Sequence, residues 1–120
     1  MLAERICWIV LALIHVTPAA TLFAPSLLSR HYGIDGGSDI VLLLQHRGAL
    51  FGVVAVACIW AAFAPGVSKL AVAIAAVSML SFLGLYLTAG PPHALRGIAI
   101  ADLIGLPFLL YLGWRAFIAA

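Results

Sequence analysis

Three polar side chains stand together in one of the most apolar parts of the 120-residue chain. Gln45, His46 and Arg47 come directly before a Gly48-x-x-x-Gly52 step, and the residues on both sides of this stretch are largely apolar. An ionisable side chain at membrane depth marks a candidate functional site, because leaving it among hydrocarbon costs free energy. His46 is able to ligate haem iron or to act as a general acid or base. Arg47 is able to bind a lipid head group, a quinone carbonyl or a small polar substrate.

Arg47 has one acidic candidate partner at its own depth, Asp102. If the second and fourth apolar segments begin near Asp39 and Ala94, both residues lie eight positions inside the same membrane face. That distance is roughly 12 Å along each helix. We therefore expect the two side chains to meet, since a lone charge at this depth costs at least a few kcal/mol. Such a pair serves either as a structural clamp between two helices or as the polar wall of a ligand site.

Further polar residues are expected near this pair. Tyr86 belongs near the outer mouth of the site, and His15 lies near the middle of the first apolar segment. His46 lies about 200° around its helix from Gly48, which directs it toward lipid, a ligand or a second protomer. The predicted ligand-binding residues are Arg47, Asp102, Gln45, Tyr86 and His15, with His46 as the candidate ligand of haem iron.

The composition places these residues in a membrane. Hydrophobic residues make up 66% of the chain and charged residues only 8%, and the mean hydropathy is +1.23. A soluble domain carries about 25% charged residues, so this chain could not cover a core with polar surface. The net charge of +2 is too small to indicate a nucleic-acid partner. We predict a single transmembrane domain over residues 1–120, with the lipid bilayer as its solvent.

Four segments are long and apolar enough to cross a bilayer, which takes about 20 residues. The predicted helices cover about residues 4–28, 39–63, 67–88 and 94–118. Proline and glycine make tight turns at 64–66 and 89–92, and short connections force sequential helices to be antiparallel. The predicted fold is therefore an all-α integral membrane four-helix bundle with up-down-up-down topology. Pro18 is expected to bend the second half of the first helix.

Basic and aromatic residues bear on the orientation of this bundle. Lys and Arg are divided almost evenly between the two predicted membrane faces, so their count orients the chain weakly. Because Arg47 lies too deep to count as a loop charge, the remaining charges favour cytoplasmic termini. Trp8, Trp60 and Trp114 fall near one membrane face and are predicted to form an interfacial aromatic belt there.

The chain resembles the DoxX-like group of small four-helix bacterial membrane proteins. The matching stretches are His46-Arg47-Gly48-Ala49, Ala61-Ala62-Phe63-Ala64-Pro65 and Ala101-Asp102-Leu103-Ile104-Gly105. The resemblance covers roughly residues 15–115 in layout. It implies a four-helix fold in the bacterial inner (plasma) membrane and a loose association with membrane redox chemistry.

The segment His46-Arg47-Gly48-Ala49-Leu50 is also similar to part of the membrane epoxide isomerases of the styrene oxide isomerase type. In those four-helix proteins a histidine of the second helix ligates haem b. The resemblance implies that His46 is the corresponding axial ligand, with the iron acting as a Lewis acid toward an epoxide oxygen.

Three functions remain open from the sequence. The leading hypothesis is the binding of a lipophilic small molecule or cofactor at a polar site in the outer half of the bundle, or membrane partnership in redox chemistry. The alternative is a haem b-dependent isomerase. A third is a small transporter, for which a homo-oligomer would supply the pathway.

Overall fold

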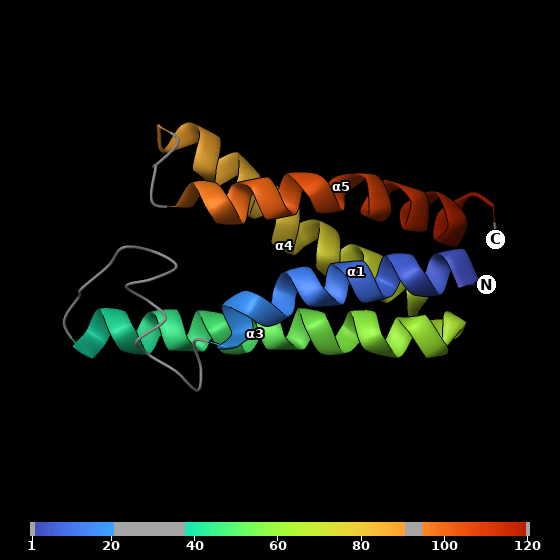
Figure 1. Ribbon diagram of the computed structural model, residues 1–120, viewed down its shortest axis with the longest axis horizontal. Coiled ribbons are helices and arrows are strands. Elements are labelled where there is room, and N and C mark those ends of the chain that lie inside the picture. Colours follow the sequence, from blue (N-terminus) through green and yellow to red (C-terminus); the bar gives the residue numbers. More distant parts are fainter. Residues whose placement is uncertain (1, 21–37, 91–94, 120) are drawn as a thin grey trace.

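The computed structural model describes residues 2–20, 38–90 and 95–119, and regular structure within these ranges is helical (Figure 1). The elements are α1 (Leu2–Ala19), α3 (Ser38–Phe63), the short 3₁₀ helix η2 (Pro65–Val67), α4 (Ser68–Thr88) and α5 (Arg96–Phe117). Within the described ranges, four helical spans are long and apolar enough to cross a membrane. The prediction of four apolar helices is confirmed.

Most predicted helix boundaries agree with the structure to within two residues. The first helix is the exception, because α1 ends at Ala19 and the predicted continuation toward residue 28 lies outside the described residues. Pro18 lies inside the last turn of α1, where it removes a backbone donor as the helix ends. Pro107 lies inside α5, which continues on both sides of it.

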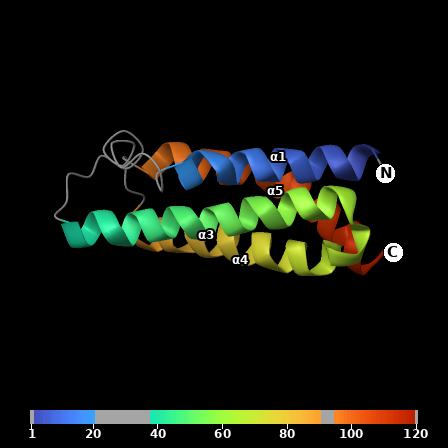
Figure 2. The same cartoon turned by 90° about the horizontal axis from the view of Figure 1, so that it is seen from below.

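The four long helices lie side by side along the long axis of the molecule (Figures 1 and 2). The first turn of α1 and the last turn of α5 lie at the same end, whereas α4 crosses behind α1 and α5 (Figure 1). α1 packs most extensively against α3, and α5 contacts both α1 and α4. The turn from α3 to α4 is closed at Ala64, whose N–H donates to the Trp60 carbonyl at 2.8 Å. Gly90, with a φ of 75°, follows the end of α4 in the left-handed region that favours glycine.

Small residues allow the helices to approach closely in the core. The buried alanines Ala12, Ala55, Ala61, Ala62, Ala71, Ala75, Ala99 and Ala116 are contributed by all four long helices. At Gly105 of α5, a Cβ atom would stand 2.8 Å from the Met79 Cε and 2.9 Å from the Ile14 Cδ1. Only a residue without a side chain fits there without a shift of neighbours, so glycine permits α1, α4 and α5 to meet at this level.

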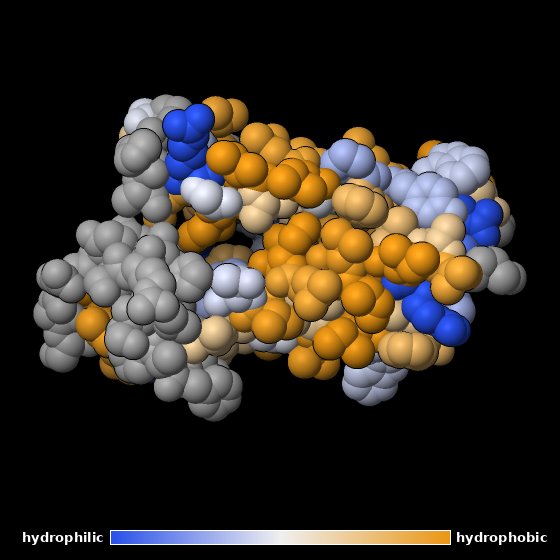
Figure 3. All heavy atoms as spheres, viewed as in Figure 1, coloured by the Kyte–Doolittle hydropathy of each residue, from blue (hydrophilic) through white to orange (hydrophobic). Residues whose placement is uncertain are grey.

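The outer surface is apolar along most of its length. Leu110 is 72% exposed and Leu42 is 66% exposed, and many other large apolar side chains are also exposed. Figure 3 shows hydrophobic residues over most of one face, with hydrophilic residues gathered toward its ends. Hydrocarbon is the solvent that suits such a surface.

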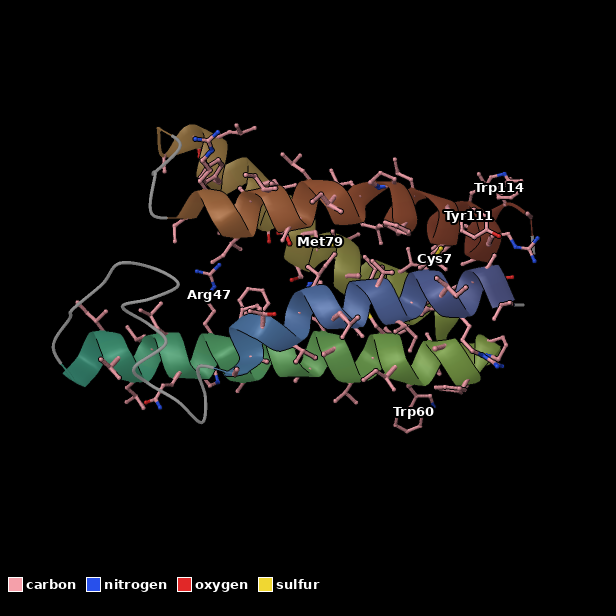
Figure 4. The ribbon with its side chains drawn as sticks, viewed as in Figure 1. Cys7, Arg47, Trp60, Met79, Tyr111 and Trp114 are labelled. Atoms are coloured by element: carbon pink, nitrogen blue, oxygen red, sulfur yellow. The ribbon has the colours of Figure 1, made fainter. Side chains whose placement is uncertain are left out.

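One predicted feature of the aromatic residues is wrong. Trp60 and Trp114 are exposed, as a belt requires (Figure 4), but Trp8 is only 1% exposed and belongs to the core. The reason is helical spacing, because Trp8 shares one face of α1 with Leu11 and His15, which are also buried. Trp8 is therefore a packing residue.

Candidate functional site

Arg47 projects from α3 into the space between helices, as Figure 4 shows. Its guanidinium carbon lies 5.2 Å from the centre of the Phe51 ring and 5.4 Å from the centre of the Phe82 ring. Phe51 is one turn further along α3, so helical geometry alone brings it beside Arg47. Phe82 comes from α4. Two aromatic rings thus stabilise the cation in a region of low polarity.

These three residues line a cavity of about 600 Å³ between α3 and α4. Ser78 and Tyr86 of α4 also line it, and the Tyr86 ring is stacked on Phe82 with 6.0 Å between centroids. Most of the other lining residues are aliphatic, and Arg47 is the charged group among them. The wall of the cavity is therefore mainly apolar. Its polar groups are the guanidinium of Arg47 and the hydroxyls of Ser78, Ser81 and Tyr86.

His15 is held in a defined orientation behind this cavity. Its side chain is 1% exposed, and Nδ1 lies 2.8 Å from the carbonyl oxygen of Leu11. A carbonyl oxygen only accepts, so Nδ1 carries the proton and Nε2 of the neutral ring is an acceptor. The hydroxyl of Ser78 donates to Nε2 at 3.3 Å, which ties α1 to α4. The Phe51 ring packs beside the imidazole at 5.9 Å between centroids.

Asp102 is the second polar residue of the core, with 5% of its surface exposed. Among the described residues, no group donates a hydrogen bond to its carboxylate. The charge of Arg47 acts on Asp102, but the ion pair that the described residues form within 4.0 Å joins Glu4 and Arg115 instead. The expected meeting of Arg47 and Asp102 is thus an interaction across a longer gap than a direct ion pair.

Asp102 and His15 line a second cavity of about 600 Å³, between α1 and α5. Phe51 lines this cavity as well as the first, so its ring stands between them. The residues predicted as one ligand site are thereby divided. Arg47 and Tyr86 face the α3–α4 cavity, and His15 and Asp102 face the α1–α5 cavity.

The two remaining predicted residues lie beside these cavities rather than in them. Gln45 is half-buried on α3 and lines neither cavity. His46 is exposed on the outer surface of α3, whereas Gly48 is buried. This agrees with the expectation that His46 is directed toward lipid, a ligand or a second protomer.

The described residues do not build a haem pocket within one chain. Both ring nitrogens of His15 are occupied by hydrogen bonds, and His46 lines neither of the two cavities. No group of three or more His, Cys, Asp and Glu side chains that could hold a metal ion occurs in the part of the chain that the structure describes. We therefore derive no reaction step through haem.

Sequence reasoning missed the residues that hold the polar groups in place. The Arg47-x-x-x-Phe51 spacing was a usable signal for the first aromatic contact. Nothing in the sequence indicated that Phe82 would cover Arg47, or that Ser78 would reach His15, because both contacts cross between helices. The same holds for Arg115, whose Nη2 donates to Glu4 Oε1 at 2.9 Å.

Comparisons with protein-family models, with curated proteins and with solved structures find no match to this chain. The two resemblances drawn from the sequence therefore stay predictions.

Proposed function

We propose that this protein is an integral membrane bundle of antiparallel helices that binds a lipophilic small molecule or cofactor through Arg47. The binding site is the α3–α4 cavity. The observation that carries the proposal is the guanidinium of Arg47, which lies over the Phe51 and Phe82 rings on the wall of a mainly apolar cavity. A ligand cavity is typically apolar with a few placed polar groups, and its usual volume of about 300–1,000 Å³ includes the value found here.

The chemistry of Arg47 defines which end of the ligand it binds. A guanidinium carries five N–H donors and no acceptor. Aromatic rings attract the charge of the guanidinium but do not take the place of a hydrogen-bond acceptor, so its N–H groups are suited to a polar head group. We propose that the head group is an acceptor, such as a carbonyl, a carboxylate or a phosphate.

The apolar part of the ligand would lie along the aliphatic wall of the same cavity. Leu50, Val53 and Val77 line it and are 53%, 57% and 70% exposed. Lining residues with that exposure place the cavity next to the lipid-facing surface. A lipophilic ligand would therefore enter sideways from the bilayer, with no aqueous path required.

The same proposal includes the location of the protein. The first turn of α1 and the last turn of α5 lie at the same end of the molecule (Figure 1), where Glu4 and Arg115 form an ion pair. That arrangement supports an even number of crossings, with both termini on one side of the membrane. We propose that this side is the cytoplasm and that the membrane is a bacterial inner membrane, where the protein serves as a partner in redox chemistry.

The test is the identity and retention of co-purified lipophilic molecules. Wild-type protein, Arg47→Met and Arg5→Met are purified in mild detergent and extracted, and lipids and quinones are quantified by mass spectrometry. Arg5 is a matched control, since its guanidinium also lies over a phenylalanine, Phe63, at 5.0 Å but lines neither large cavity. We expect one species at near-stoichiometric amounts in wild type and in Arg5→Met, and its loss in Arg47→Met.

Equal retention by Arg47→Met, with folding verified by circular dichroism, would refute the proposal. The visible spectrum of the same wild-type sample tests the haem hypothesis. A Soret band that His46→Ala abolishes would replace the proposal with the haem-dependent one.

A further inference from the structure

We infer that the α1–α5 cavity is a second binding site, which takes a lipophilic molecule bearing a neutral hydroxyl group, and that this hydroxyl donates to Asp102. The inference does not depend on the ligand proposed for Arg47. It concerns a different cavity, different helices and a group of opposite hydrogen-bonding character.

Asp102 is a buried carboxylate that has no hydrogen-bond donor among the described residues. Its carboxylate is nearly enclosed, lines the cavity and receives no hydrogen bond from the described residues. Buried polar groups in folded proteins almost always have a hydrogen-bond partner, because leaving one without a partner costs free energy. Since no described side chain donates to this carboxylate, we assign its donor to a molecule bound in the cavity that it lines.

Few polar side chains face the α1–α5 cavity. His15 faces it as a neutral ring whose only acceptor nitrogen already accepts from Ser78. Thr17 also lines the cavity, and among the described residues neither its hydroxyl nor any other side chain donates to Asp102. The described wall thus offers Asp102 no bound donor, whereas the Arg47 cavity carries the guanidinium donors. The two cavities would select ligands of opposite character.

The nearby charge of Arg47 favours a neutral donor over a cation at Asp102. The charge of Arg47 already acts on Asp102, and the Phe51 ring that separates the cavities also contacts Arg47. An ammonium group bound to Asp102 would lie close to this existing cation and be repelled by it. A hydroxyl supplies the missing hydrogen bond without adding a charge.

The wall of the α1–α5 cavity indicates what the apolar part of the ligand is. The volume of about 600 Å³ is lined mainly by aliphatic side chains, among them Ile14, Ile98 and Ile104. Leu13 and Ile104 are 62% and 59% exposed, so the cavity adjoins the lipid-facing surface. Figure 3 shows the surface hollowed on this face beside the start of α5. A long-chain or isoprenoid alcohol fits such a wall.

The test is photolabelling of the whole protein in mild detergent with three matched probes. These are a long-chain primary alcohol that carries a diazirine near its hydroxyl, the methyl ether of this alcohol, and the corresponding primary amine. Cross-linked peptides are identified by mass spectrometry at increasing probe concentration. We expect saturable labelling within residues 10–18 and 97–104 by the alcohol. The ether should label at least about tenfold more weakly, as the loss of a hydrogen bond to a charged group predicts. The amine should also label more weakly, because the Arg47 charge repels it.

Two variants keep the test independent of folding. Asp102→Leu removes the acceptor but keeps a side chain suited to burial, and it should weaken alcohol labelling about tenfold or more. Ala101→Phe leaves Asp102 intact and fills the cavity, so it should abolish labelling. Arg5→Met should label as wild type does, because Arg5 lies outside the cavity.

Three outcomes would overturn the inference. Equal labelling by the alcohol and its ether would mean that no hydroxyl is recognised. Stronger labelling by the amine would mean that Asp102 binds a cation. Non-saturable labelling would mean that the alcohol only partitions into the detergent and has no discrete site in this cavity. Retention of co-purified lipids by the Arg47 variants is measured separately, so failure here leaves the proposed function standing.

Discussion

Removal of the Ser78 hydroxyl tests whether the buried histidine links α1 to α4. Ser78 donates to His15 Nε2 over 3.3 Å, which is long for a hydrogen bond. A buried acceptor left without a donor costs about 1–3 kcal/mol, whereas hydrogen bonds between membrane helices average about 0.6 kcal/mol. The long distance places this bond near the lower values, so we expect a coupling energy of about 0.5–1 kcal/mol between the two side chains.

The single Ser78→Ala variant would hide part of this effect. Alanine is a better helix former than serine by up to about 0.7 kcal/mol, which offsets the loss of the hydrogen bond. A double-mutant cycle with His15→Leu cancels the helix term, since it appears on both sides of the cycle. The free energy of unfolding is measured in mixed micelles by titration with a denaturing detergent and followed by circular dichroism.

Ser81→Ala provides the matched control for this cycle. Ser81 is also on α4, but its hydroxyl donates to the Ser78 carbonyl and does not reach His15. We expect its coupling to His15→Leu to be zero within about 0.3 kcal/mol. A Ser78 coupling no larger than that of Ser81 would refute the link between His15 and α4.

Three further results are expected. Arg47→Ala should lower the free energy of unfolding and the addition of Asp102→Ala should restore part of it, whereas strictly additive losses would show that the two charges do not interact. In single-tryptophan proteins placed in vesicles of brominated lipid, Trp60 should be strongly quenched and Trp8 hardly at all, and equal quenching would contradict the burial of Trp8. Gly105→Ala should change the free energy of unfolding by less than about 1 kcal/mol, because its Cβ would meet the flexible ends of the Met79 and Ile14 side chains and alanine favours the helix by at most about 1 kcal/mol. A loss of about 3 kcal/mol would show instead that these side chains cannot move aside.

The helical content and the apolar surface follow from the sequence alone. Four stretches of membrane length, the last three of them separated by turns of proline and glycine, leave the backbone no other way to satisfy its hydrogen bonds in hydrocarbon. The outward orientation of His46 relative to the buried Gly48 also follows, because positions along one helix are related by a fixed angle. These features depend only on local geometry and on the solvent.

The contacts between helices could be identified only from the tertiary structure. The sequence placed Arg47 and Asp102 at one depth but not in separate cavities, since depth does not specify the rotation and tilt of each helix. It assigned Trp8 to an exposed belt, whereas packing against neighbouring helices buries this side chain. Whether a buried polar group meets a donor, an aromatic ring or a cavity depends on side chains that come from other helices, and packing alone decides which of them arrive.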